Sequence, residues 1–218
     1  MDGIIYDIEI IEIPPKKGEE PIPGLKYCQG WRDYTGMHIS CICAYELGTG
    51  DYRVFLQDNF HAFQELVNQC EWIIGFNSQR FDDEVCRSNG IQITTNYDLL
   101  LETWSAAGIN PAGPFGDAHK GFRLEDIAQA NLGTGKSGEG ANAAVLWQQG
   151  KFGQVIDYCL RDVRLTAQLW ERRANLISPV DGSELCLREP HEQPRVFGVE
   201  VLDFDDLVAK AQLAAKLL

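Results

Sequence analysis

The run GIIYDIEIIEI at residues 3–13 constrains the fold more than any other part of the chain. It is rich in β-branched residues and stops at Pro14-Pro15, which cannot continue a sheet ladder, so it predicts a β-strand. Within the run, Asp7 and Glu9 are two residues apart, and the period of a strand places both carboxylates on one side of the sheet. Carboxylates are depleted from buried strands, and two close together repel. Either this is an edge strand with one solvated face, or a cation lies between the two groups.

The rest of the N-terminal half predicts an alternation of strands and helices. Residues 14–37 hold four of the nine prolines and read as a long irregular insertion. Two strands separated by Gly48-Thr49-Gly50 indicate an antiparallel hairpin. After the first strand we therefore expect strands at 38–47 and 51–56, a helix at 59–70 with Asp58 as its N-cap, a strand at 71–76 and a helix at 81–89 that ends at Asn89-Gly90.

The C-terminal half is mainly helical by pattern. Its longest periodic segment, 152–176, carries an apolar stripe that predicts a helix, and residues 178–202 read as a loop with one or two short strands. Further elements are expected as a strand at 92–98, helices at 99–107, 123–131 and 142–149, and a terminal helix at 204–217 capped by Asp203. Together these elements predict an α/β domain over 1–176, with a mixed sheet flanked by helices, and a C-terminal extension over 177–218.

Charge and cysteine content narrow the class of protein. The net charge of −13 opposes tight nucleic-acid binding, but residues 120–173 carry 8 Lys and Arg against 6 Asp and Glu and are the one net basic stretch. The seven cysteines lack the spacing of a secreted scaffold and indicate reduced, buried thiols. Cys41 and Cys43 face one side of a strand, but no second Cys/His pair accompanies them, so no zinc site is expected. No signal peptide or membrane span is recognised, which favours the cytoplasm.

Two later segments place further acidic residues at the start of one predicted helix and on one face of another. Asp82 follows a buried strand at the start of a helix, where a carboxylate also serves as a simple cap, and Asp83 and Glu84 compete with it for any role. Tyr158 and Asp162 are four apart on the long helix, so their side chains share one helix face beside the apolar stripe. Each feature alone is common.

In combination, YDIEI, GFNSQRFD and YCLRD occur in the order and contexts of the three exonuclease motifs of the DEDD superfamily. With Tyr158 four residues before Asp162, residues 3–175 resemble the DEDDy subgroup, and most closely the proofreading exonuclease domain of family-B DNA polymerases. The resemblance implies a ribonuclease-H-like fold and removal of nucleotides from the 3′ end of single-stranded DNA or RNA. It also implies two Mg²⁺ or Mn²⁺ ions held by Asp7, Glu9, Asp82 and Asp162.

The chemistry fits these residue types. Two hard cations that bind the attacking and leaving oxygens of a phosphodiester need oxygen ligands, chiefly carboxylates. Tyr158, as the motif places it, orients the attacking water more than it removes the proton, because a phenol is a weak base near neutral pH. No polymerase region accompanies the motifs, so a free-standing nuclease is expected. The alternative is a metal-binding but weakly active nucleic-acid-binding or adaptor module.

Substrate contacts follow partly from the resemblance. Asn77 and Phe81 match residues that touch the terminal nucleotide, although Phe81 is equally suited to core packing, and Asp98 matches an acidic position that supports the site. Lys136 lies in the Gly-rich stretch NLGTGKSGEG, which lacks the preceding strand of a phosphate-binding loop for nucleotide hydrolysis but can hold a nucleic-acid backbone. One departure is Ile10, because the family usually has Thr there, so a nucleotide contact is lost or supplied elsewhere. Other candidate phosphate contacts are Lys120, Arg123, Lys151, Arg161 and Arg164.

Overall fold

The computed structural model of the chain describes residues 2–15, 18–113, 116–134 and 143–190. Its centre is a five-stranded sheet with the strand order β3-β2-β1-β4-β5. β1 pairs in parallel with β4 and β4 with β5, while β2 runs antiparallel to both of its neighbours. This order, with β2 as the reversed strand, is that of a ribonuclease-H-like sheet, so the predicted fold class is confirmed.

The strands lie close to their predicted positions. They are β1 (Gly3–Ile10), β2 (Ile39–Glu46), β3 (Tyr52–Phe55), β4 (Trp72–Gly75) and β5 (Tyr97–Asp98). β1 ends before the prolines. Beyond it, the Ile11 N–H donates to the His38 carbonyl at 2.8 Å, and Ile13 forms an isolated bridge with Tyr27. The insertion at 14–37 is irregular where it is described, apart from a 3-10 turn at Tyr34–Gly36.

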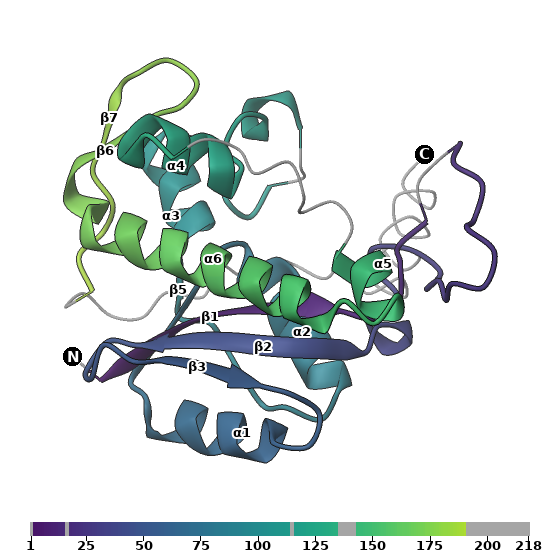
Figure 1. Cartoon of the computed structure of the whole chain (residues 1–218). Helices are drawn as coiled ribbons and strands as arrows, with labels where there is room; N and C mark the ends of the chain where they lie inside the picture. The colour runs from purple at the N-terminus through teal and green to yellow at the C-terminus, as the bar shows by residue number, and fades with distance from the viewer. Residues whose placement is uncertain (1, 16–17, 114–115, 135–142, 191–218) are drawn as a thin grey trace, which may run out of the picture.

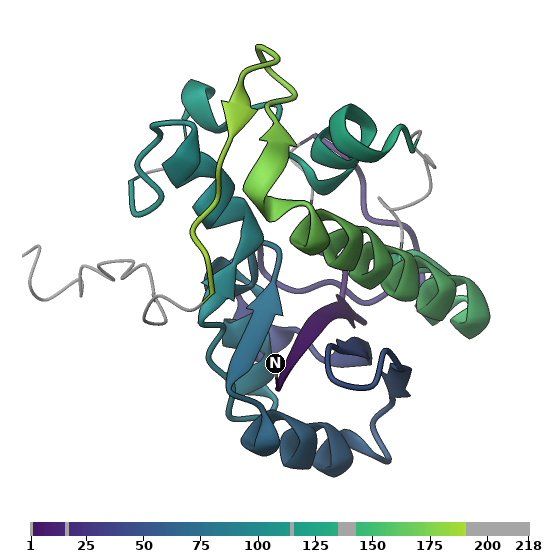
Figure 2. The ribbon, with the colours of Figure 1, turned by 90° about the vertical axis from the view of Figure 1, so that its left-hand side faces the viewer.

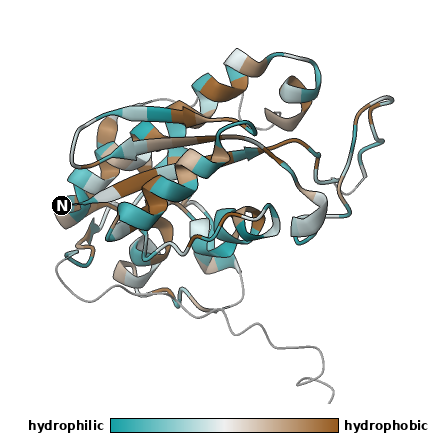
Figure 3. Ribbon diagram, turned by 90° about the horizontal axis from the view of Figure 1, so that it is seen from below, coloured by the Kyte–Doolittle hydropathy of each residue, from teal (hydrophilic) through white to brown (hydrophobic). Residues whose placement is uncertain are grey.

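Helices cover both faces of the sheet, and α6 (Phe152–Glu171) lies across β1 and β2 (Figure 1). On the opposite face lie α1 (Phe60–Gln69) and α2 (Asp82–Ser88). The helices α3 (Leu99–Ala106), α4 (Leu124–Leu132) and α5 (Ala143–Gln148) gather around α6. Brown and teal alternate along several helices in Figure 3, as expected for amphipathic helices on a sheet.

The alternation along β1 divides the core into two layers. Ile4, Tyr6 and Ile8 pack toward α1 and α2, whereas Ile5 packs toward α6. Because side chains alternate across a strand, Asp7 and Glu9 share the face of Ile5 and lie under α6. The predicted separation of the carboxylates from Tyr6, Ile8 and Ile10 is therefore confirmed.

Three predicted boundaries were wrong, each because side chains capture backbone groups. Asp58 does not cap α1; the cap is Asn59, whose Oδ1 accepts from the Leu56 N–H at 2.7 Å. Only Tyr97–Asp98 of the 92–98 strand is extended in the sheet, since the N–H groups of Gln92 and Thr95 donate to side chains of Gln64 and Asp83 instead.

The third boundary is the end of the long helix, which stops at Glu171 and not at 176. Asn131 holds Ile177 through both its backbone groups, at 2.6 and 2.9 Å, so the chain leaves the helix and forms β6 (Leu176–Ile177) with β7 (Glu184–Leu185). Figure 2 shows this hairpin continuing directly from α6. Beyond it, Arg188 pairs with Glu102 of α3 at 2.9 Å.

The predicted terminal helix at 204–217 lies outside the described residues. Within the described residues, no helix combines the length and the apolar character that a membrane crossing needs.

Candidate active site

Asp7 and Glu9 project from β1 toward α6, where both residues are half-buried. Burial raises the pKa of Asp7 well above its usual range, and the nearby charges of Asp82, Glu9 and Asp162 raise it further. Burial likewise raises the pKa of Glu9, with added contributions from Cys41, Asp162 and Asp82. The register of β1 against β2 shifts between Glu9 and Ile10, and such a bulge re-aims side chains beside functional sites.

Asp82 approaches the same two carboxylates from the start of α2. The chain arrives there through a sharp turn after β4, in which Asn77 adopts a left-handed φ of 66° that asparagine tolerates better than most residues. Gly75 is required before this turn, because a Cβ there would collide with the side chain of Ser78. Asp82 is 5% exposed, and burial, followed by the charge of Asp83, raises its pKa to about 7.

Tyr158 and Asp162 approach from α6. The Tyr158 hydroxyl lies near the Asp162 carboxylate, as the i,i+4 spacing predicts, and lowers the pKa of that carboxyl against the effect of burial. Burial raises the pKa of Asp162 to about 6. Burial, and then the Asp162 charge, raises the pKa of Tyr158 above the ordinary value of a phenol. Tyr158 therefore stays protonated near neutral pH and acts as a hydrogen-bond donor.

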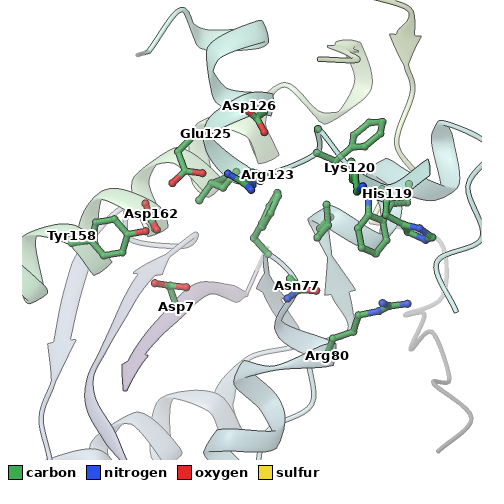
Figure 4. A pocket seen from close by; sticks show the side chains of 16 residues that line it. Asp7, Asn77, Arg80, His119, Lys120, Arg123, Glu125, Asp126, Tyr158 and Asp162 are labelled. Carbon is green, nitrogen blue, oxygen red and sulfur yellow. The ribbon is translucent and has the colours of Figure 1, made fainter. Parts of the chain in front are cut away.

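Asp7, Tyr158 and Asp162 line a pocket of about 800 Å³ that opens beside α6, whereas Glu9 and Asp82 are not part of its lining. In Figure 4, Tyr158 and Asp162 lie above Asp7, with Arg123 and Lys120 across the pocket and Asn77 and Arg80 below. The pocket thus has an acidic wall and a mixed wall that includes basic side chains. Its lining residues are Asp7, Phe76, Asn77, Arg80, Leu100, Trp104, His119, Lys120, Gly121, Phe122, Arg123, Leu124, Glu125, Asp126, Tyr158 and Asp162.

Asp98 supports the turn that carries Asn77. Its carboxylate accepts from the backbone N–H groups of Asn77 and Gln79 at 2.9 and 3.0 Å, and it caps α3 through Leu100 and Leu101 at 3.1 and 3.2 Å. Burial raises the pKa of Asp98 to about 6, although these hydrogen bonds oppose the shift. This position agrees with the supporting role expected for Asp98.

Of the residues expected to contact the substrate, one lines the pocket, one does not, and one lies outside the described residues. Asn77 lines the pocket, whereas Phe81 lies outside the lining and packs edge-on against Trp31 and Tyr34 of the insertion, at 5.9 and 6.3 Å between ring centroids. These contacts support the interpretation that Phe81 has a packing role. A contact between Phe81 and a nucleotide stays a prediction. Lys136 lies outside the described residues.

Several lining residues had no sequence signal of their own. Arg80 lies within GFNSQRF but was not singled out; its guanidinium donates to the carbonyl groups of Pro111 and Gly113 and lies 5.2 Å from the Trp104 ring centroid. Trp104 in turn stacks edge-on with His119, at 4.6 Å between centroids. These contacts join segments far apart in the sequence, which no local pattern shows.

The oxygen atoms of Asp7, Glu9, Asp82 and Asp162 lie farther apart than the ligand atoms of a single bound ion. Among the described residues, only Cys41, Cys43 and Cys159 place three ligand atoms within 4.8 Å of one another. Asp7, Glu9, Asp82 and Asp162 are nevertheless close enough that their charges raise one another's pKa. They offer the hard oxygen donors that Mg²⁺ and Mn²⁺ prefer.

No protein-family model and no curated protein matches this chain. Solved structures that are similar to it include the following three. A family B DNA polymerase from the hyperthermophilic archaeon Pyrobaculum calidifontis has 14% identity and a TM-score of 0.43 over 83% of this chain and 26% of the polymerase. An ExoI/SSB-Ct complex has 17% identity and a TM-score of 0.34 over 79% of this chain and 44% of that one.

The third is the zinc-bound E. coli ExoI-ssDNA complex, with 16% identity and a TM-score of 0.39 over 79% of this chain and 43% of that one. The chain thus spans less than half the length of each of these proteins. At such identities and TM-scores, the functional interpretation rests on the side chains of the pocket.

Proposed function

We propose that this chain is a 3′–5′ exonuclease that hydrolyses phosphodiester bonds at the 3′ end of single-stranded nucleic acid. One observation carries the proposal. Four carboxylates come from three distant segments, Asp7 and Glu9 on β1, Asp82 on α2 and Asp162 on α6. The charges of Asp82 and Asp162 raise the pKa of Asp7 and of Glu9, and Asp7, Asp162 and Tyr158 line an open pocket.

Electrostatics support divalent cations as the partners of these carboxylates. A buried carboxylate whose neighbours are other carboxylates is destabilised as a charge, and the raised pKa values of Asp7 and Glu9 express that cost. Oxygen atoms spread beyond one coordination sphere suit two ions that share the set, about 3.5–4 Å apart in two-metal sites. Asp7, Glu9, Asp82 and Asp162 would hold the two Mg²⁺ or Mn²⁺ ions, which stabilise the charge that develops on the phosphoryl oxygens.

Other residues of the pocket position the attacking water and bind the substrate. Because burial and the Asp162 charge raise the pKa of Tyr158, its hydroxyl stays protonated beside Asp162, so it fixes the position of the attacking water and does not act as the base. Arg123 and Lys120, on the far wall, are placed to bind the negatively charged backbone of the substrate. Asn77 is held by Asp98 with its side chain in the pocket, where it can contact the terminal nucleotide.

A single assay tests the proposal. A single-stranded oligonucleotide labelled at its 5′ end is incubated with the chain and Mn²⁺, and the products are separated on a sequencing gel. A ladder that shortens from the 3′ end, and that disappears with EDTA or a 3′-phosphate, supports the assignment. Cleavage of a circular single strand would show an endonuclease instead. Binding without cleavage would favour the alternative of a nucleic-acid-binding module. Matched DNA and RNA strands in the same assay identify the preferred sugar.

A further inference from the structure

Three cysteine thiols meet in the core between β2 and α6. Cys41 and Cys43 are two apart on β2 and therefore face the same side, and Cys159 reaches them from α6. The three sulfur atoms lie within 4.8 Å of one another, and each residue is 0% exposed. The remaining described cysteines, Cys28, Cys70, Cys86 and Cys186, do not belong to this cluster.

The spacing of the sulfur atoms suits one thiophilic cation. A Zn–S bond of about 2.3 Å implies sulfur atoms about 3.8 Å apart around a tetrahedral ion, so the cluster needs to contract by no more than about 1 Å. Thiolates are soft ligands and select zinc and copper over magnesium and manganese. The cluster therefore differs in chemistry from the carboxylates of the pocket.

The cysteine cluster lies next to Asp7 and Glu9 in the sheet. Cys43 lies directly opposite Asp7 in the pairing of β1 with β2, and Cys41 lies opposite Glu9. The Cys159 thiol donates to the main-chain carbonyl of Asp7 at 3.4 Å, and Cys159 follows Tyr158 in the chain. A cation among the three sulfur atoms would fix β1, β2 and α6 to one another next to the pocket.

We propose that Cys41, Cys43 and Cys159 form a buried trithiolate site for a divalent thiophilic cation of the zinc class. On binding, three S–H bonds break, three sulfur–metal bonds form and the three protons pass to solvent. A divalent ion leaves a net charge of −1 on the site, whereas a monovalent ion would leave −2. Because buried charge is costly, the divalent ion is favoured. This inference is independent of the nuclease assignment.

Cadmium is a suitable probe, because its thiolate complexes absorb in the near ultraviolet where oxygen complexes do not. The full chain is refolded with a non-thiol reductant, excess Mg²⁺ to occupy carboxylates, and one equivalent of Cd²⁺. We expect one Cd²⁺ per chain and a thiolate absorption band. Cys159→Ser and Cys41→Ser should each weaken Cd²⁺ binding about 100-fold or more, since loss of a ligand exceeds the 10–100-fold effect of an outer-shell change.

Two controls make the test specific. Cys86→Ser changes another fully buried cysteine in the opposite core layer and should leave Cd²⁺ binding unchanged. The double variant Asp7→Asn, Glu9→Gln removes carboxylates of the pocket and should keep the thiolate band while losing nuclease activity. The two proposals can thus fail separately.

Circular dichroism establishes that each variant is folded. Should a serine variant not fold, ¹¹³Cd NMR of the unaltered chain still counts the sulfur ligands from the chemical shift. A shift typical of three thiolates supports the site. A folded, reduced chain without a thiolate band, a ¹¹³Cd shift typical of oxygen ligands, or an unchanged band in folded Cys159→Ser would overturn it.

Discussion

Asp82 and Asp83 are adjacent in the sequence and both are buried, with 5% and 2% of their surfaces exposed, yet they meet different surroundings. Asp83 accepts hydrogen bonds from the Tyr6 hydroxyl at 2.5 Å, from the Thr95 backbone N–H at 2.9 Å and from the Thr95 hydroxyl at 2.8 Å. Asp82 instead adds its charge to those of Asp7 and Glu9. Asp83 is surrounded by donors, whereas the charge of its neighbour Asp82 raises the pKa of two other carboxylates.

The difference separates a structural role from a functional one. Burial of a carboxylate is tolerated when donors replace the lost water, as around Asp83 and Asp98. Where carboxylates face one another, the charge needs cations or protons. We therefore expect substitutions around Asp82 to affect catalysis and metal binding, and substitutions around Asp83 to affect folding.

The largest expected effect is that of Asp162→Asn. It removes a negative ligand from the proposed cation site, so nuclease activity should fall below detection. The fold should survive, and the metal-free chain should be as stable as before or more stable, because repulsion with Asp7 and Glu9 is relieved. Single-turnover cleavage and thermal melting in EDTA measure both effects. A normal cleavage rate would remove α6 from the catalytic site.

Tyr158→Phe should have a smaller effect on catalysis, because it removes one hydroxyl group and leaves the ring packed. Loss of water positioning should slow single-turnover cleavage by about 10²–10⁴-fold, the usual range for acid–base and proton-positioning groups. Mn²⁺ affinity should stay near normal, and calorimetry checks it. An unchanged cleavage rate would contradict the role given to Tyr158.

Asp83→Ala should reduce stability and not chemistry. It leaves the Tyr6 hydroxyl and both Thr95 donors without their acceptor in the core, at a cost of about 3–5 kcal/mol. The melting temperature should drop by roughly 10 °C. Cleavage per folded molecule, measured well below the melting point, should change little. Asp83→Asn keeps an acceptor oxygen and should cost less.

The smallest effect is the pH dependence of stability. The pKa of Asp82 is raised to about 7 and that of Asp162 to about 6, so the folded chain binds these protons more tightly than the unfolded chain. Their contribution to stability is full below the unfolded pKa and is lost as pH rises through about 6 to 7. In EDTA, the melting temperature should therefore fall by a few degrees between about pH 5 and pH 7.5.

Mn²⁺ should flatten that dependence, because the cations take the place of the protons on Asp82 and Asp162. The share due to Asp98, whose pKa is raised to about 6 away from the proposed ions, should remain. Melting curves with EDTA and with Mn²⁺ across this range provide the check. A stability that rises with pH in EDTA would contradict the raised pKa values of Asp82 and Asp162 in the folded chain.

The contrast between Asp82 and Asp83 also separates the features that a local sequence pattern predicts from those that depend on tertiary contacts. The period of a strand is local, so the shared face of Asp7 and Glu9 followed from β1 alone, as did the pairing of Tyr158 with Asp162 on one helix face. The prediction that Asp82, and not Asp83, is a metal ligand came from the match to the exonuclease motifs. The helix pattern alone does not distinguish the two residues, because both begin the same helix. The donors that satisfy Asp83 come from β1 and from the turn before β5, and no local pattern predicts that meeting.

Another part of the pocket lining could not be predicted from local patterns either. Arg80, Trp104 and His119 come together through contacts between loops, and loop paths depend on tertiary hydrogen bonds such as those from Arg80 to Pro111 and Gly113. The same holds for Phe81, whose neighbours Trp31 and Tyr34 lie in the irregular insertion.

The most direct test of the account compares the two neighbours. Mn²⁺ binding is measured by titration calorimetry at neutral pH for the unaltered chain, Asp82→Asn and Asp83→Asn. We expect the unaltered chain and Asp83→Asn to bind Mn²⁺ alike, and Asp82→Asn to lose more than about 100-fold in affinity. Equal Mn²⁺ binding by Asp82→Asn and the unaltered chain, or an equal loss in both variants while both remain folded, would contradict it.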